Sequence, residues 1–263
     1  MSNKESTQKT FVVAFLLCLV CSIIVSTAAV MLKPAQVANK AKDFKINILK
    51  AGGLYDQGVA DGKSIDEMFA NVTPKLVNLE TGEYTDAVDI DTYDQRKASK
   101  DPALSNDLSS EQDLANISRQ VKYSKVYLIN EGEEIKKIIL PVSGYGLWST
   151  LYGFISLESD LNTVSGITFY EHAETPGLGG EIDNPNWKAQ WQGKAVYNGE
   201  VGENVALTVI KGKVNENTPD KEYKVDGLSG ATLTARGVDN LVKFWMGDMG
   251  YSKYLDNLKN GEA

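Results

Sequence analysis

The sequence predicts an α+β protein in which an N-terminal transmembrane helix precedes a soluble domain with a mainly antiparallel sheet and segregated helices. The first observation is an apolar run without a charge at residues 11–32. The second is a series of short strand-like runs, separated by turn residues, that starts at residue 125. The third is one amphipathic helical stripe close to the C-terminus. Successive strands followed by a helix favour an antiparallel sheet with helices set apart from it.

Composition excludes several classes of function. The chain has 263 residues, with 27 Lys and Arg against 35 Asp and Glu and a net charge of −8. This acidity argues against general nucleic-acid binding, which depends on basic side chains. The two cysteines, Cys18 and Cys21, lie in the apolar run, and His172 is the single histidine. We therefore expect neither a disulfide framework nor a metal site in the rest of the chain.

The apolar run is long enough to be a membrane anchor. Its 22 residues would extend roughly 33 Å as a helix, which covers the hydrocarbon core of a bilayer. The run exceeds the apolar core of a cleaved signal peptide, usually about 7 to 15 residues, so we expect an uncleaved anchor after a short tail at residues 1–10. Lysines flank the run on both sides, and the sequence by itself leaves its orientation open.

Residues 33–124 are expected to form a tether and the N-terminal part of the soluble region. Lys33–Lys42 is polar and contains Pro34, so we expect it to be the tether. Helix-like patches follow as far as Leu79. Between residues 80 and 120 acidic residues dominate and large apolar residues are few. This acidic segment is expected to be a solvated excursion outside the core.

Residues 125–254 have the regular pattern of a folded domain, followed by a C-terminal tail at residues 255–263. A helix is expected to begin near Thr232 and to stop near Gly247, because apolar residues recur there at helical spacing. Alternation and turn residues predict strands before it. They are expected at residues 126–142 (a hairpin), 152–157, 164–170 and 205–210.

Two loops of this domain are richer in glycine and polar groups than a plain core requires. Gly144–Ser149 follows the hairpin, and its Leu147 and Trp148 offer apolar surface to a ligand. His172–Gly180 follows a strand, and its backbone amides could meet phosphate or ring heteroatoms. Ordinary glycine turns would explain both loops as well, and a lone histidine is more often structural than catalytic. The candidate binding residues of the second loop are Glu174, Thr175, Leu178 and Gly179.

A third segment, Asp226–Thr234, lies where the last helix is expected to begin. Ser229 could cap that helix, and Gly230 permits close approach of the backbone. The first amides of a helix are unpaired donors at the positive end of its dipole, so a phosphate would fit there. An ordinary serine cap is the simpler explanation. The segment is not a Walker loop, since the Gly-Lys-Ser/Thr sequence is missing.

Taken together, the segments resemble a known family. GYGLWS, EHAETPGLGG and DGLSGATLT, followed by FWMGDMG, resemble the C-type subunits of bacterial sodium-translocating NADH:quinone reductases. Asp226, Ser229, Gly230, Ala231 and Thr232 are similar to the flavinylation motif of the wider FMN-binding domain family. The resemblance implies an FMN-binding domain at residues 125–254. It also implies FMN held by a phosphoester bond to Thr232, placed there by a dedicated flavin transferase.

The resemblance further implies a redox role within a complex. The protein would be an electron carrier without a substrate site of its own, passing electrons from upstream iron centres toward quinone-reducing membrane subunits. It would sit in the bacterial inner membrane as a single-pass protein with its soluble domain in the periplasm, bound to the other subunits of a sodium-transporting translocase. The flavin ring would lie between Leu147 and Trp148 on one side and residues 175–179 on the other.

Three alternatives stay open on the sequence. The G-type subunit of a related ion-translocating electron-transport complex shares the main motifs. A membrane-anchored hydrolase or transferase could use His172 with Glu174 and a hydroxyl such as that of Ser229. An anchored binding module could hold a phosphorylated ligand reversibly. Flavin absorbance that survives acid precipitation would separate a covalent flavoprotein from the last two.

Overall fold

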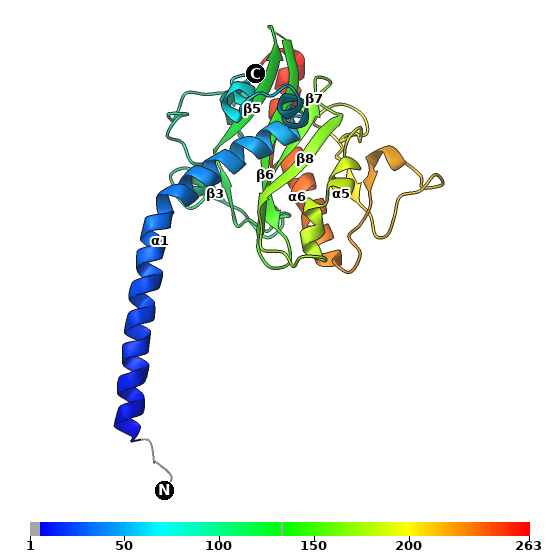
Figure 1. Ribbon diagram of the computed structural model, residues 1–263. Coiled ribbons are helices and arrows are strands. Elements are labelled where there is room, and N and C mark those ends of the chain that lie inside the picture. The colour runs from blue at the N-terminus through cyan, green and yellow to red at the C-terminus, as the bar shows by residue number, and fades with distance from the viewer. Residues whose placement is uncertain (1–5, 133) are drawn as a thin grey trace. The chain divides into compact units, whose positions relative to one another are not determined.

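A computed structural model describes residues 6–132 and 134–263, so part of the expected tail, residues 1–5, lies outside the described residues. The chain divides into two compact units, Met1–Phe44 and Lys45–Ala263 (Figure 1). Helix α1, Thr7–Ala51, begins in the first unit and ends in the second. The expected boundary at residue 125 falls inside the second unit.

The first unit is helical from Thr7 onward. Its apolar window, residues 11–32, is exposed, and α1 is long and apolar enough to cross a membrane. The expected tether, Lys33–Lys42, is helical and continues α1 with Pro34 inside it. A proline removes one backbone hydrogen bond, but the Ala- and Lys-rich residues that follow have high helix propensity. The helix therefore continues through Pro34.

A single antiparallel sheet organises the second unit (Figure 1). The predicted hairpin and the two strands after it are confirmed. Two further strands, β1 and β2, extend the sheet on the hairpin side and were not predicted. In sheet order the strands are β2 (Glu83–Tyr84), β1 (Val72–Asn78), β5 (Tyr123–Glu131), β6 (Glu134–Tyr145), β7 (Thr150–Glu158) and β8 (Val164–Glu171).

Alternation along the strands gives the sheet two buried faces. Ile138 and Leu140 of β6 belong to the main core, which also contains the apolar side of α6, Thr232–Met246. Ile139 between them is fully buried but lies outside that core cluster. A Cβ on Gly52, just after α1, would touch the Ile139 side chain. The end of α1 thus covers one face, and α6 covers the other, behind the strands in Figure 1.

Short elements complete the second unit. The predicted helix from Thr232 to about Gly247 is confirmed as α6. The strand expected at residues 205–210 is only two residues long, and residues 255–260 of the expected tail belong to α7. The remaining elements are α2 (Tyr55–Ala60), α3 (Ile65–Phe69), α5 (Pro185–Ala189), α7 (Ser252–Asn260), β9 (Thr208–Val209), β10 (Lys224–Val225) and 3₁₀ turns at Gly179–Asp183 and Lys221–Tyr223.

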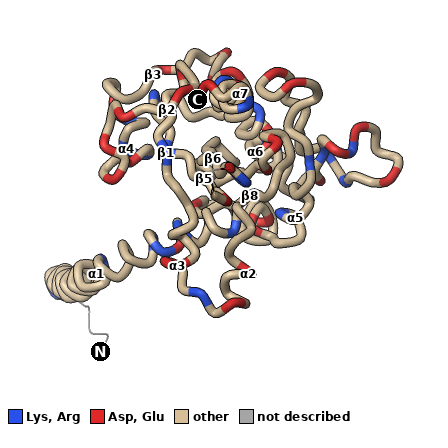
Figure 2. The backbone as a smooth tube through the Cα atoms, turned by 90° about the horizontal axis from the view of Figure 1, so that it is seen from above, with Lys and Arg blue, Asp and Glu red and all other residues tan. Residues whose placement is uncertain are grey.

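The acidic segment is ordered onto this core. It contains α4 (Gln95–Ala98), β3 (Ser105–Asp107) and most of β4 (Arg119–Val121), and Figure 2 shows Asp and Glu in the loops around α4 and β3. Most of its residues are exposed, as expected. However, Ala98 and Ala115 are buried in the core cluster, where the expectation was wrong. Small side chains fill the core there without creating an apolar run in the sequence.

Candidate functional site

The three glycine-rich segments meet at one buried carboxylate. Glu174 is 5% exposed, and its Oε1 accepts hydrogen bonds from the backbone amides of Leu147 (3.1 Å), Trp148 (2.9 Å) and Ser149 (3.4 Å). Its Oε2 accepts the Thr234 hydroxyl at 2.6 Å. One side chain of the second loop therefore joins the first loop to the first turn of α6.

Glycine allows this close approach. A Cβ on Gly146 would lie 2.7 Å from Oε1 of Glu174, and one on Gly179 would lie 2.6 Å from Oε2. Farther along α6, a Cβ on Gly237 would lie 2.4 Å from the Tyr145 carbonyl oxygen. Side chains at these positions would push the segments apart. The glycines of the loops are thus needed for packing within the protein.

The start of α6 differs from the expected serine cap. The Ala231 amide donates to the Leu228 carbonyl at 3.2 Å, and Gly230 occupies the left-handed region at φ +73°. This turn makes Ala231 the N-cap residue, with no side-chain cap. The prediction that Ser229 caps the helix was wrong, because the turn at Gly230 sets Ser229 two residues before the N-cap. Thr232 is the first helical residue and is exposed.

The unpaired amides of this helix start suit an anion. The first hydrogen bond recorded at this end runs from the Ala235 amide to the Ala231 carbonyl at 3.0 Å. The amides before it have no partner within the helix, and they point out of its positive end. An exposed Thr232 hydroxyl stands beside them. This donor set fits a phosphate group linked to Thr232.

Asp226 holds the Asp226–Thr234 segment in place through hydrogen bonds to neighbouring parts of the chain. Its Oδ1 accepts the Val214 amide at 2.7 Å, and its Oδ2 accepts the Gln190 amide group at 3.3 Å. The Asp226 carbonyl accepts the indole N–H of Trp187 at 2.8 Å. The carboxylate expected to bind cofactor is therefore placed to hold the loop that leads to Thr232.

Apolar side chains of the three segments stand in solvent. Leu178 lies against Gly230, whose Cβ position is 3.1 Å from the Leu178 Cδ2. Single exposed apolar side chains are ordinary on a protein surface, but apolar side chains gathered in one patch indicate a binding surface. Five of those in the second unit belong to these segments, and their exposed fractions range from 39% to 65%: Tyr145, Leu147, Trp148, Leu178 and Leu233.

His172 is tied into its own loop. Its Nε2 lies 2.8 Å from Oδ2 of Asp183, and its Nδ1 accepts the Glu174 amide at 3.2 Å. Both ring nitrogens therefore have partners nearby in the chain, one in the loop and one at the end of the 3₁₀ turn that follows it. Because neither partner is a hydroxyl, the described residues contain no hydrogen-bonded pair of His172 with a nucleophile. The geometry gives no support to the hydrolase alternative.

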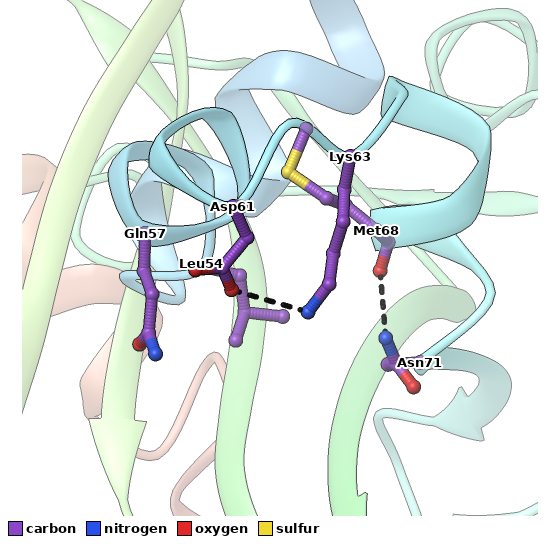
Figure 3. Close-up of a pocket in the computed structure, with 7 residues that line it drawn as sticks. Leu54, Gln57, Asp61, Lys63, Met68 and Asn71 are labelled. Carbon is purple, nitrogen blue, oxygen red and sulfur yellow. Dashed lines mark hydrogen bonds and ion pairs between the residues drawn. The ribbon is translucent and has the colours of Figure 1, made fainter.

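A separate pocket lies at α2 and α3 (Figure 3). It shares no residue with the three segments. Some of its polar side chains have partners: Lys63 lies 3.3 Å from Asp61, and the Asn71 side chain donates to the Met68 carbonyl at 3.4 Å. The lining residues are Leu54, Gln57, Gly58, Asp61, Lys63, Met68 and Asn71.

Sequence reasoning missed two members of the site. Thr234 is fully buried and donates to Glu174, and Tyr145 belongs to the exposed apolar group. Nothing local marks Thr234, because its partner is 60 residues away in the chain. The position of Tyr145 beside the glycine turn could have suggested its exposure.

Comparisons with known proteins match both the domain and the whole chain. A family described as FMN-binding domain matches residues 146–247. The C-type subunit of the Na(+)-translocating NADH-quinone reductase from Pseudomonas aeruginosa is 49% identical over 264 aligned residues, covering 100% of both chains. Its counterpart of the same name from Vibrio anguillarum is 47% identical over 99% of this chain and 98% of its own. The crystal structure of Shewanella oneidensis NqrC is similar with a TM-score of 0.75 and 31% identity, covering 85% of this chain and 99% of that one.

Proposed function

The chain belongs to the NqrC family, the C-type subunits of the Na(+)-translocating NADH-quinone reductases, and from this premise we propose that it carries FMN on Thr232 and relays electrons within such a complex. It is a subunit of the NADH:quinone oxidoreductase and contains an FMN-binding domain. The full-length C-type relatives favour this assignment over the G-type subunit of the related complex. The proposal adds a covalent phosphoester, the electron relay and the residues that serve it.

The start of α6 is the observation that carries the proposal. Thr232 is exposed at the first helical position, beside unpaired amides and without a side-chain cap. A phosphate esterified to its hydroxyl keeps a negative charge, which the helix dipole and these amides stabilise. Ser229, Gly230 and Ala231 supply the turn that leaves this helix end open.

The surrounding side chains are suited to an aromatic ring. Leu147, Trp148 and Leu178 present exposed apolar surface, Leu178 against Gly230 and the other two on the turn that Glu174 links to the first turn of α6. The Thr175 residue is exposed on the same loop as Leu178. Contact with these side chains would exclude water from the ring, while loop amides and the Thr175 hydroxyl could donate to its heteroatoms. FMN supplies the capacity to take up and release electrons singly. The protein supplies attachment, orientation and a partly apolar environment.

Assembly and location follow from the same family. The chain would bind the other subunits of the complex, and a flavin transferase would attach FMN during maturation. Helix α1 would anchor it in the bacterial inner membrane as the single span within the described residues. The soluble unit would face the periplasm. Sodium transport belongs to the complex, and the apolar window of α1 from residue 11 to 32 has no charged side chain with which to conduct ions.

Replacing the proposed attachment residue tests the chemistry directly. In cells that contain the flavin transferase, we expect the wild-type chain to run as a flavin-fluorescent band after denaturing electrophoresis, and Thr232→Ala to run without fluorescence. Because Thr232 is exposed and makes no side-chain contact that holds the fold, the variant should unfold at nearly the wild-type temperature.

Thr234→Ala is the matched control. It removes a hydroxyl two residues along the same helix, and loss of its bond to Glu174 should lower stability by about 1 to 3 kcal/mol while the band stays fluorescent. Fluorescence that persists in Thr232→Ala, or that disappears only in Thr234→Ala, contradicts the assignment.

A further inference from the structure

Glu174 holds a buried negative charge without a cationic partner among the described residues. Its ion-pair distance to every described Lys, Arg and His exceeds the 4.0 Å of a salt bridge, and its partners are three amides and one hydroxyl. Burial raises the pKa of the Glu174 carboxyl, but the hydrogen bonds from Thr234 and from the amides of Trp148, Leu147 and Ser149 outweigh burial and lower it overall. The group is therefore ionised at neutral pH.

The carboxylate has little capacity left for a ligand. Two carboxylate oxygens offer about four acceptor positions, and four protein donors already face them. The Cβ positions of Gly146 and Gly179, 2.7 and 2.6 Å from the two oxygens, show how closely backbone surrounds the group. Glu174 was expected to contact the cofactor. Its hydrogen bonds connect the Leu147–Ser149 turn to the first turn of α6 within the protein.

From this arrangement we infer that Glu174 is a positioning residue: its carboxylate fixes the Leu147–Ser149 turn against the first turn of α6, and its charge makes a flavin on Thr232 harder to reduce. The inference rests on the proposed function. Thr232 is two residues before Thr234, which donates to Glu174. By fixing the turn against Thr234, the carboxylate sets the distance between the apolar side chains of the turn and Thr232. A fixed negative charge next to a redox group in a partly apolar site disfavours the addition of an electron to that group.

Two conservative variants separate charge from geometry. Glu174→Gln keeps the shape and removes the charge: its carbonyl oxygen can accept the three amides, and its NH₂ can donate to the Thr234 oxygen after the hydroxyl rotates. Glu174→Asp keeps the charge but is one methylene shorter, so it cannot reach both partners. Glu203→Gln, at an exposed position in the 198–204 loop, removes one negative charge outside the site and serves as the control.

The first measurement is a redox titration of the full-length flavinylated protein in detergent. We expect the midpoint potential of Glu174→Gln to be more positive than that of the wild type, and the potential of Glu203→Gln to be unchanged. A purely structural role for Glu174 would leave the potential of the Gln variant at the wild-type value, and this result would overturn the charge effect.

The second measurement needs no flavin. In the Thr232→Ala background, whose absorbance spectrum reports whether flavin is absent, we expect Glu174→Asp to lower the unfolding temperature clearly and Glu174→Gln to lower it much less. Equal unfolding temperatures for Glu174→Asp and its parent would contradict the inference that Glu174 fixes the turn against α6. Flavin retained on Thr232→Ala would refute the attachment site, and the effect of the Asp variant on stability would still be measured.

Discussion

Hydrogen bonds at both ring nitrogens fix the tautomer of His172 and shift its pKa. Its Nδ1 accepts the Glu174 amide, so the neutral ring carries its proton on Nε2, where Asp183 accepts it. The hydrogen bond to Asp183 raises the pKa of His172 above the ordinary value near 6.5, against the opposing effect of burial. The histidine thereby holds the start of the loop that contains Glu174.

Because the chain contains one histidine, its titration can be followed without ambiguity. We expect an NMR titration of the His172 ring to give a pKa above 6.5, and Asp183→Asn to lower it, because the variant removes the acceptor charge. A pKa that is the same in both proteins would show that Asp183 does not stabilise the protonated ring.

The same shift gives a sign for the dependence of stability on pH. A pKa that is higher in the folded state than in the unfolded state stabilises the fold fully below the unfolded pKa, about 6.5. That contribution disappears as the pH rises through the folded pKa. Asp183→Asn should therefore lower the unfolding temperature more at about pH 5.5 than at about pH 8.5. The opposite ordering would contradict the assignment of the raised pKa to Asp183.

At the scale of elements, glycines determine how closely α6 approaches the sheet. A Cβ on Gly144 would lie 2.8 Å from the Cβ of Leu241, and one on Gly237 would lie 2.4 Å from the Tyr145 carbonyl oxygen. The Trp245 indole completes this contact by donating to the Ser143 carbonyl at 2.7 Å. The helix that presents Thr232 is thus seated directly on the end of β6.

This close contact between α6 and the end of β6 predicts that Gly237→Ala, a substitution that usually stabilises a helix, lowers stability here. Gly→Ala within an exposed helix gains about 1 kcal/mol of helix propensity, but at Gly237 the new methyl group meets backbone that cannot move aside. We expect Gly237→Ala to lower the free energy of unfolding by about 1 to 3 kcal/mol, as overpacking does, measured by denaturant titration. Asn240→Ala, on the same helix and partly exposed, is the control and should be neutral or slightly stabilising. A stable Gly237→Ala would mean that α6 can shift on the sheet.

Local sequence patterns predict the elements that have a clear periodicity and miss those whose formation depends on distant contacts. The strands from β5 to β8 and α6 have clear periodicity, and all of them were predicted. Strand β1 was missed because Pro74 interrupts it. Proline is tolerated there because β2 pairs β1 only at Val77 and Asn78, so that the β2 side is unpaired at Pro74. The presence of a free edge at one residue is a tertiary fact that no local pattern contains.

At the scale of the whole molecule, the candidate site could be predicted in parts but not as an assembly. Each of the three segments stood out by its glycines and polar residues. Their convergence on Glu174 depends on contacts 25 to 27 and 60 residues apart in sequence. The role of Glu174 in fixing the Leu147–Ser149 turn against α6, and the displacement of Ser229 from the cap, follow only from the folded arrangement.

The division into two units also shows where the proposed membrane anchor can be removed. The units meet between Phe44 and Lys45, inside α1. The last turns of α1 belong to the second unit, where Ile48, Leu49 and Ala51 are completely buried. Lys45 adds an ion pair to Asp66 of α3 at 2.7 Å. Residues 45–51 are therefore part of the packed second unit, although they continue the helix proposed as the anchor.

Truncation at two points tests this division. A chain that starts at Lys45 should be soluble and cooperatively folded, because deletion of residues 1–44 removes the apolar window and leaves the sheet covered. A chain that starts at Gly52 should unfold or aggregate, since loss of a buried Ile or Leu side chain costs about 2 to 5 kcal/mol each, and typical domains are stable by only about 5 to 15 kcal/mol. Thermal unfolding by circular dichroism compares the two, and Ile48→Ala in the longer chain should give an intermediate loss. Equal stability of the two truncated chains would show that the end of α1 is dispensable. Retention of the Lys45 chain in the membrane fraction after a carbonate wash would reveal a second membrane-binding surface.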